Sequence, residues 1–195
     1  MSAKTVKLAV LGSTNGTDLI AIYNAIQTGE LKAKIEIVIS NKADAGLLAK
    51  AKDWNLNYKY LEPAATRAEF DKKVLAELQK YSPDLILLIG YMRLISPVLV
   101  QAYTNKILNV HPSLLPKFAG GMNTDVHSEV IKAGEKETGC TIHIVDEGVD
   151  TGPIVLQKKC AVEPTDTPAT LKQKVQKLEG EAFIEVIKTY AYRNS

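Results

Sequence analysis

Two polar residues stand two positions apart at the end of an apolar run. Residues 107–110 read Ile-Leu-Asn-Val, which is typical of a buried strand, and His111 and Pro112 follow directly. Because side chains two apart in a strand face the same side, Asn109 and His111 are expected to project together. An Asn amide donates hydrogen bonds, and a His ring donates or exchanges a proton. Two such donors suit an oxyanion that develops during acyl transfer.

A loop that carries carboxylates supplies a third candidate group. Residues 146–153 read DEGVDTGP and lie between the strand-like runs 140–145 and 154–162. A carboxylate near His111 would raise the pKa of its imidazole and orient the ring. A substrate amine can then attack directly, so no nucleophile is needed, and Ser113 lies in no nucleophile elbow. Without this third group, the simpler interpretation of an Asn-x-His pattern is a strand end that satisfies nearby backbone.

The first loop of the chain is a candidate anion site. Residues 12–18, GSTNGTD, follow a strand-like run at 6–11 and precede a helical pattern. Backbone N–H groups at a helix N-terminus favour an anion such as phosphate. The loop matches neither the dinucleotide fingerprint nor the Walker motif. Asp18 would repel a phosphate unless it points away, or it simply favours the helix N-terminus. The alternative is an ordinary helix N-cap, with Thr14, Asn15 or Thr17 as the capping side chain.

Strand-like and helix-like segments alternate along the first half of the chain. The predicted strands are 6–11, 35–39, 58–61, 85–89 and 107–110. The predicted helices are 18–29, 45–54, 68–81 and 97–102. This alternation predicts a parallel sheet with right-handed crossovers, and the very apolar run at 85–89 suits its centre.

The second half has a different pattern. A helix is predicted at 126–133, followed by the neighbouring strands 140–145 and 154–162 and a terminal helix at 168–190. We therefore predict an α/β fold: a mostly parallel, doubly wound, Rossmann-like sheet with an antiparallel C-terminal portion and a terminal helix. No repeat or linker interrupts the sequence, so residues 1–195 are interpreted as a single domain.

Composition narrows the partners and the location. The 195 residues carry 24 basic and 22 acidic side chains, a net charge of +2 that argues against a nucleic-acid or anionic-membrane surface. No run of 18 apolar residues occurs, and the N-terminus lacks the apolar stretch of a signal peptide. A cytoplasmic protein is therefore expected.

The remaining residues of chemical interest favour structural roles. Cys140 and Cys160 are predicted to be buried small hydrophobes rather than a disulfide, and two cysteines are too few for a zinc cluster. His127 lies in a helical pattern and is interpreted as a surface or packing residue. His143 alternates along a strand and is expected to partner the neighbouring loop, with support of the catalytic site as the alternative. Trp54 is predicted to lie in the core.

Motifs along nearly the whole chain resemble those of the folate-dependent formyltransferases. In order, they are VLGSTNGTDL, ISNKADA, LIGYMRLIS, LNVHPSLLPKF, GCTIHIVDEGVDTGPIVLQ and VQKLE. HPSLLP followed by a D-x-G-P-type loop is specific as a combination, although neither half is specific alone. Within the family, the chain most resembles members that formylate glycinamide ribonucleotide in de novo purine (IMP) biosynthesis.

The resemblance implies substrates and residue roles. The co-substrate is expected to be 10-formyltetrahydrofolate and the acceptor glycinamide ribonucleotide, with no metal. The catalytic residues are expected to be Asn109, His111 and Asp150. The implied ribonucleotide residues are Asn15, Gly16, Thr17, Asp18, Gln176 and Glu179. The implied folate residues are Met92, Arg93, Ile95, Leu108, Asn109, Val145, Asp146, Val149 and Asp150. The family usually has Asn at the position of Asp18. The loop 118–127 is longer than the common form, and this length is predicted to reshape the substrate entrance.

The resemblance also implies a mechanism and a division of the chain into two functional halves. The amine attacks the formyl carbon, protonated His111 and Asn109 hold the oxyanion, and Asp150 keeps His111 cationic. Residues 1–105 form the phosphate-binding half and 106–195 the catalytic and folate-binding half, in a monomer or homodimer that binds neither nucleic acid nor membrane.

Related activities remain as alternatives. Formyltetrahydrofolate hydrolase would share the site but is expected to carry an N-terminal regulatory module. Methionyl-tRNA and sugar-nucleotide formyltransferases are expected to carry further domains. A non-catalytic small-molecule binding module is a rival that the fold alone does not exclude.

Overall fold

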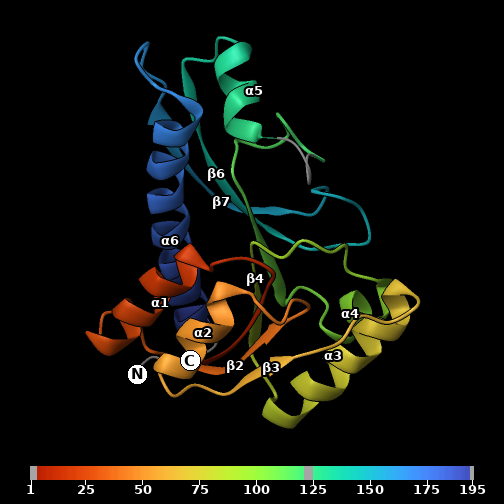
Figure 1. Cartoon of the computed structure of the whole chain (residues 1–195). Helices are drawn as coiled ribbons and strands as arrows, with labels where there is room; N and C mark the ends of the chain where they lie inside the picture. Colours follow the sequence, from red (N-terminus) through yellow and green to blue (C-terminus); the bar gives the residue numbers. More distant parts are fainter. Residues whose placement is uncertain (1–3, 121–124, 194–195) are drawn as a thin grey trace.

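The computed structural model describes residues 4–120 and 125–193 as strands and helices that alternate along the chain (Figure 1). The strands are β1 (Val6–Gly12), β2 (Ala33–Ser40), β3 (Tyr58–Tyr60), β4 (Leu85–Ile89), β5 (Ile107–His111), β6 (Glu137–Ile144) and β7 (Ile154–Ala161). The helices are α1 (Thr17–Gln27), α2 (Gly46–Asp53), α3 (Arg67–Tyr81), α4 (Pro97–Ala102), α5 (Val126–Lys132) and α6 (Pro168–Arg193).

All the strands belong to one sheet, in the order β3-β2-β1-β4-β5-β6-β7. The strands from β3 to β5 are parallel, whereas β6 runs antiparallel to both β5 and β7. The predicted fold class, a mostly parallel doubly wound sheet with an antiparallel C-terminal portion and a terminal helix, is confirmed.

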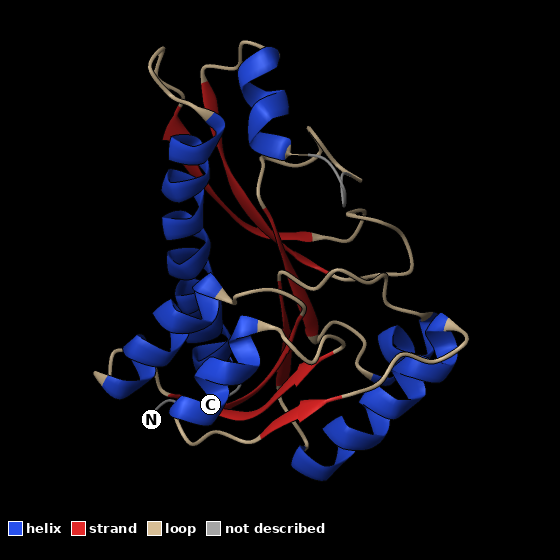
Figure 2. Cartoon of the chain, in the orientation of Figure 1, coloured by secondary structure: helices blue, strands red, loops and turns tan. Residues whose placement is uncertain are grey.

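Helices cover both faces of the sheet, so alternate strand residues enter two separate cores (Figure 2). On β1, Leu8 and Val10 pack in the core that also holds residues of α1, α2 and α6. Ala9 and Leu11 face the other way, into the core with residues of α3 and α4. Burial on both faces explains why the central strands read as continuous apolar runs.

The winding of the sheet reverses between β1 and β4, which lie side by side. Ligands of open α/β sheets bind beyond the carboxyl ends of the strands at such a reversal. The two loops that leave these strands contact each other: the Ser13 N–H donates to Gly90 O at 3.0 Å, and Ser13 Oγ accepts from the Met92 N–H at 2.9 Å. A Cβ on Gly90 would lie 2.3 Å from Thr14 Oγ1, so glycine permits this close approach.

Strand β5 extends one residue beyond its predicted end, and this extension matters for the site. His111 still pairs with β6, opposite Thr141, and Asn109 pairs with His143. The antiparallel partner therefore continues the ladder past the point where the apolar run stops. The terminal helix also extends beyond its predicted end at Tyr190, to Arg193.

The other structural expectations can be compared directly. Cys140 and Cys160 are free, as predicted, although only Cys140 is fully buried. Trp54 is half-buried rather than a core residue, and its ring stacks on that of Tyr23 with centroids 4.0 Å apart.

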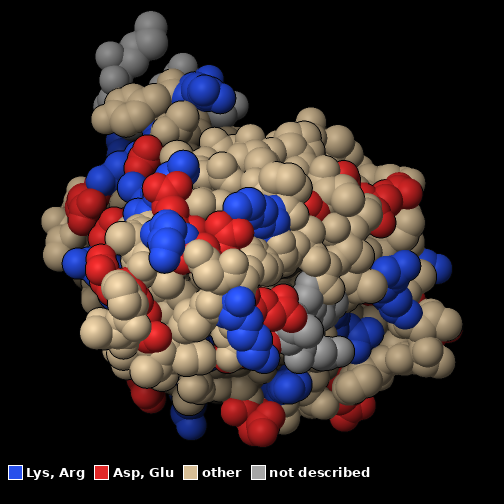
Figure 3. All heavy atoms as spheres, turned by 90° about the horizontal axis from the view of Figure 1, so that it is seen from above, with Lys and Arg blue, Asp and Glu red and all other residues tan. Residues whose placement is uncertain are grey.

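Charge and hydropathy of the folded chain agree with the compositional analysis. Acidic and basic side chains are interspersed on the face seen in Figure 3, without a large field of one sign. Within residues 4–120 and 125–193, no helix has both the length and the apolar character needed to cross a bilayer.

Candidate active site

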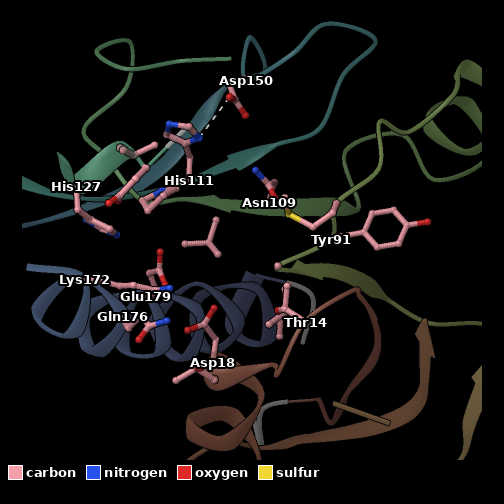
Figure 4. A pocket seen from close by; sticks show the side chains of 18 residues that line it. Thr14, Asp18, Tyr91, Asn109, His111, His127, Asp150, Lys172, Gln176 and Glu179 are labelled. Carbon is pink, nitrogen blue, oxygen red and sulfur yellow. Dashed lines mark ion pairs between the residues drawn. The ribbon is translucent and has the colours of Figure 1, made fainter. Parts of the chain in front are cut away.

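A cavity of about 670 Å³ opens at the carboxyl ends of the central strands (Figure 4). Its walls come from the loops after β1 and β4, the end of β5, the loop between β6 and β7, and the helices α1, α5 and α6. It is lined by Thr14, Thr17, Asp18, Ile89, Gly90, Tyr91, Met92, Asn109, Val110, His111, Pro112, Asp125, Val126, His127, Asp150, Lys172, Gln176 and Glu179. Two distant parts of the sequence, residues 14–18 and 172–179, thus face the predicted catalytic residues.

The three predicted catalytic residues lie together on one wall of this cavity. Asn109 and His111 come from β5, and Asp150 comes from the loop between β6 and β7 (Figure 4). His111 Nδ1 lies 3.3 Å from Asp150 Oδ2. The Gly120 N–H donates to the same carboxylate oxygen at 2.9 Å, so Asp150 is held from two sides.

His143 connects the amide to the carboxylate. Its Nδ1 lies 3.0 Å from Ile144 O, and its Nε2 lies 3.1 Å from Asn109 Nδ2 and 3.5 Å from Asp150 Oδ1. A neutral ring with its proton on Nδ1 accepts from Asn109, whereas a protonated ring donates to Asp150. The sequence predicted a partner for the neighbouring loop; the structure places His143 between two predicted catalytic residues.

The surroundings of His111 act on its pKa in opposite directions. Burial lowers the pKa of His111 below its ordinary value, and the Asp150 carboxylate and the Phe118 carbonyl only partly offset this effect. Asp150 thus raises this pKa, as predicted, but burial and the nearby His143 lower it by more in the ligand-free protein. His111 Nε2 is 2.9 Å from Phe118 O, so both ring nitrogens face acceptors.

The surroundings of Asp150 favour its charged form, whereas those of His111 favour its neutral form. The contact of Asp150 with His143 is the main cause that lowers its pKa to about 2, helped by the Gly120 N–H and by His111 and opposed by burial. The carboxylate is therefore charged at neutral pH, as the mechanism implied by the resemblance requires.

The predicted ribonucleotide residues divide into those that line the cavity and those that do not. Thr17, Asp18, Gln176 and Glu179 line it from α1 and α6. Asn15 does not line it: its side chain lies against Gly46 at the start of α2.

The alternative interpretation of the first loop, a side-chain cap by Thr14, Asn15 or Thr17, is wrong. The N-cap is Gly16, with φ 65°, and no side chain accepts a capping hydrogen bond. The first N–H groups of α1 therefore lack a side-chain cap at the wall of the cavity, which keeps the anion-site interpretation of this loop.

Most of the predicted folate residues surround a smaller second cavity of about 100 Å³. It shares Asn109 and Asp150 with the main cavity and is lined by the predicted residues Arg93, Ile95, Asn109, Val145, Asp146, Val149 and Asp150. The Arg93 guanidinium lies over the Phe70 ring, 4.2 Å from its centroid.

Two predicted folate residues lie elsewhere. Met92 lines the main cavity and not the second one. Leu108 lines neither cavity: it precedes Asn109 on β5, so its side chain faces the opposite side of the sheet, in the core with α6.

Comparisons with known proteins agree with this architecture. Residues 6–187 match the formyl transferase family. The chain belongs to the formyl transferase family.

Individual relatives agree over nearly the whole length. The phosphoribosylglycinamide formyltransferase of Bacillus subtilis is 38% identical, over 93% of both chains. That of Escherichia coli is 35% identical, over 95% of this chain and 87% of its own. The crystal structure of glycinamide ribonucleotide transformylase 1 from Geobacillus kaustophilus superposes with a TM-score of 0.90 at 35% identity, covering 96% of this chain and all of the other.

Several cavity residues of this formyl transferase were not predicted from its sequence. His127 on α5 is 6% exposed and lines the main cavity, so it is neither a surface residue nor a residue of the apolar core. Lys172 precedes Gln176 by one turn of α6 and lines the same cavity. Arg67, at the start of α3, lines the second cavity. The four-residue spacing of Lys172 and Gln176 was the available signal, since it places both on one helix face.

Two further observations on the formyl transferase concern a metal site and the loop at 118–127. Among the described residues, no group of three or more His, Cys, Asp or Glu side chains is arranged to hold a metal ion. Residues 121–124 of the longer loop at 118–127 lie outside the described residues, so the predicted effect of its length on the substrate entrance stays a prediction.

Proposed function

We propose that this chain transfers the formyl group of 10-formyltetrahydrofolate to the amine of glycinamide ribonucleotide in purine biosynthesis. The observation that carries the proposal is the convergence of Asn109, His111 and Asp150 on one cavity. The chain that holds them matches phosphoribosylglycinamide formyltransferases over nearly its full length. The main cavity would hold the ribonucleotide between α1 and α6, and the adjoining cavity the pterin. Asn109 and Asp150, which line both, would then lie where the two substrates meet.

The amide of Asn109 suits the oxyanion of the reaction. The substrate amine forms a bond to the formyl carbon, and the carbonyl oxygen becomes negative before the bond from carbon to N10 breaks. The Asn109 amide has two N–H groups, and only one is directed at His143. The second can donate to the oxyanion, an interaction whose loss removes about 2.7–4 kcal/mol of transition-state stabilisation.

The pair of His111 and Asp150 suits the proton transfers. The attacking amine loses a proton, and N10 of the folate must gain one before it leaves. A proton on His111 Nδ1 is stabilised by Asp150 at 3.3 Å, and one on Nε2 by Phe118 O at 2.9 Å. The charged ring is therefore stabilised as soon as it forms, although burial lowers the pKa of His111 in the free protein.

Proximity supplies a further part of the rate. Two substrates held side by side react as if at a very high effective concentration, worth about 7–11 kcal/mol in well-oriented systems. The arrangement needs no covalent intermediate. Ser113 is buried and donates to Lys117 O at 2.7 Å, so it is not placed as a nucleophile.

Folate difference absorbance tests the proposal. The purified protein is mixed with 10-formyltetrahydrofolate and, in parallel, with glycinamide ribonucleotide, with a tRNA or with water alone. We expect rapid loss of the formyl folate only with glycinamide ribonucleotide, accompanied by the formylated product. Equal loss in water would indicate a hydrolase, and turnover with tRNA alone a different acceptor; either result would overturn the assignment.

A further inference from the structure

The main cavity, which reaches between α1 and α6, is lined by more acidic than basic side chains. Asp18, Asp125, Asp150 and Glu179 all line the cavity, whereas Lys172 is the one lysine, and no arginine occurs, among its lining residues within the described chain. A phosphate group is expected at the start of α1, next to Asp18. Two negative groups at such short range repel strongly, the more so where protein replaces water. Some feature must therefore reduce the negative charge at this end.

Two of the carboxyl groups are paired with each other. Asp18 on α1 and Glu179 on α6 are 6% and 7% exposed and both line the main cavity (Figure 4). Their carboxyl groups lie close enough for each to affect the pKa of the other. A Cβ on the neighbouring Gly180 would lie 2.6 Å from Ala21 Cβ, so glycine lets the two helices approach closely enough for this contact. Because an ionised carboxylate has no donor, a hydrogen bond between two carboxyl groups requires a proton on one of them.

The surroundings of the pair do not compensate two negative charges. Of the titratable groups that face it, Lys172 on α6 lowers the pKa of Glu179, but burial raises that pKa by more. Cys140 on β6 is a neutral thiol whose pKa burial raises to about 12. His127 on α5 lies on the far side of Lys172, and burial lowers its pKa. Burial likewise raises the pKa of Asp18, to about 7.

Asp18 also has an oxygen that points to no protein group. Within the described chain, its Oδ1 is buried and has no hydrogen-bond partner. Oδ1 belongs to a residue that lines the cavity and precedes Leu19 in the first turn of α1. An unpartnered buried carboxyl oxygen at this position is tolerated far better when the group is neutral.

We propose that Asp18 and Glu179 share a proton. The phosphate of the ribonucleotide then binds at the start of α1 only while this carboxyl pair retains that proton. This inference rests on the proposed function and adds to it a condition on ribonucleotide binding. It makes Asp18 a specificity-determining residue: with the shared proton the pair carries a single negative charge, and when that proton is lost, at about pH 7, the pair becomes doubly negative and repels phosphate more strongly.

The pH dependence of ribonucleotide binding tests the proposal. KM for glycinamide ribonucleotide is measured from pH 7 to 9 in the wild-type protein and in Asp18→Asn, whose amide cannot ionise. In the wild type we expect KM to rise relative to the variant by up to about tenfold per pH unit, the slope of one lost proton. The ratio of the two proteins cancels titration of the substrate's own amine and phosphate. KM for the folate should keep the same pH dependence in both.

A matched control separates this effect from any loss of charge on α6. Glu181→Gln removes an exposed carboxylate two residues from Glu179 and should reproduce the wild-type profile. If Asp18→Asn shows the same rise in KM with pH as the wild type, the shared proton has no role in ribonucleotide binding and the proposal is overturned.

A spectroscopic measurement keeps the proposal testable even if the enzyme assignment fails. Carbon-13 NMR of the side-chain carboxyl groups, recorded on the ligand-free protein, should show an Asp signal that titrates near pH 7 in the wild type and is missing in Asp18→Asn. Ionisation of both carboxyl groups below pH 5 would contradict the shared proton. Absence of formyl transfer in every protein would overturn the proposed function instead, and the two failures are thus distinguishable.

Discussion

Asp18 and Asp150 are the same residue type in the same cavity, yet their surroundings drive them to opposite charge states. Asp150 meets His143, the Gly120 N–H and His111, which lower its pKa to about 2. Burial raises the pKa of Asp18 to about 7, and its contact with Glu179 offsets only part of this rise. One end of the cavity thus holds a fixed negative charge beside an imidazole, and the other holds a pair that stores a proton. The difference shows that partners and burial, rather than residue type, set the chemistry of each end.

The largest effect is expected at the catalytic end, from Asn109→Ala. Loss of the amide that donates to the oxyanion should lower kcat by about 10²–10³-fold, the usual loss for one such donor. Steady-state formyl transfer measures the change, and circular dichroism checks that the fold is intact. A variant that is folded and retains more than a tenth of the wild-type kcat would remove Asn109 from the mechanism.

Asp150→Asn should lower kcat at least tenfold, because the amide removes the charge that stabilises protonated His111. The pKa of His111, followed by NMR of the imidazole, should fall further in this variant, since Asp150 is among the groups that raise it. Asp44→Asn, at an exposed position, is the matched control. Near-normal turnover by Asp150→Asn would show that the carboxylate acts only as a structural support.

The contributions of the two carboxyl groups to the free energy of unfolding should change with pH in opposite directions. The folded-state pKa of Asp150 is depressed, so its contribution is present above about pH 4 and is lost as the pH falls towards 2. The folded-state pKa of Asp18 is raised, so its contribution is present below about pH 4 and is lost as the pH rises to about 7. For Asp150 the shift corresponds to about 2 kcal/mol.

Urea unfolding at pH 3, 5 and 7 measures both contributions. Relative to the wild type, Asp150→Asn should lose stability mainly at pH 5 and 7, whereas Asp18→Asn should gain stability as the pH rises from 5 to 7. Parallel pH profiles for the two variants would mean that the two ends do not differ as described.

The smallest effect is expected for His143→Gln, up to about tenfold in kcat. A Gln amide can still accept from Asn109 but lacks the ring contact that is the main cause of the lowered pKa of Asp150. The acid limb of the pH-rate profile should therefore move to higher pH, while KM for the ribonucleotide stays unchanged. An unchanged profile would limit His143 to packing.

The sequence predicted the fold and several of the residues that line the cavities, because both depend on local patterns. Alternating apolar runs and helical periodicity defined the sheet, and the motifs around Asn109 and Asp150 defined the catalytic wall. The pairing of Asn109 with His143 was not predictable in this way, since it depends on the register between β5 and β6. The position of Leu108 in the core with α6 was predictable, since strand alternation places it on the side of the sheet opposite to Asn109.

Packing between residues that are distant in sequence explains the remaining errors of the sequence predictions. The net pKa of His111 depends on how deeply the ring is covered, which no local pattern shows. The contact of Asp18 with Glu179 joins residues at opposite ends of the chain through the packing of α1 on α6. His127 and Lys172 became visible as cavity residues only when α5 and α6 were placed.

A crystal structure of the complex with glycinamide ribonucleotide and a non-reactive 10-formylfolate analogue tests the central claim most directly. We expect the carbonyl oxygen of the analogue within hydrogen-bond distance of Asn109 Nδ2, the pterin beside Arg93 and Ile95, and the ribonucleotide amine directed at the carbonyl carbon. An analogue bound away from Asn109, with the main cavity holding only one of the two substrates, would contradict the account.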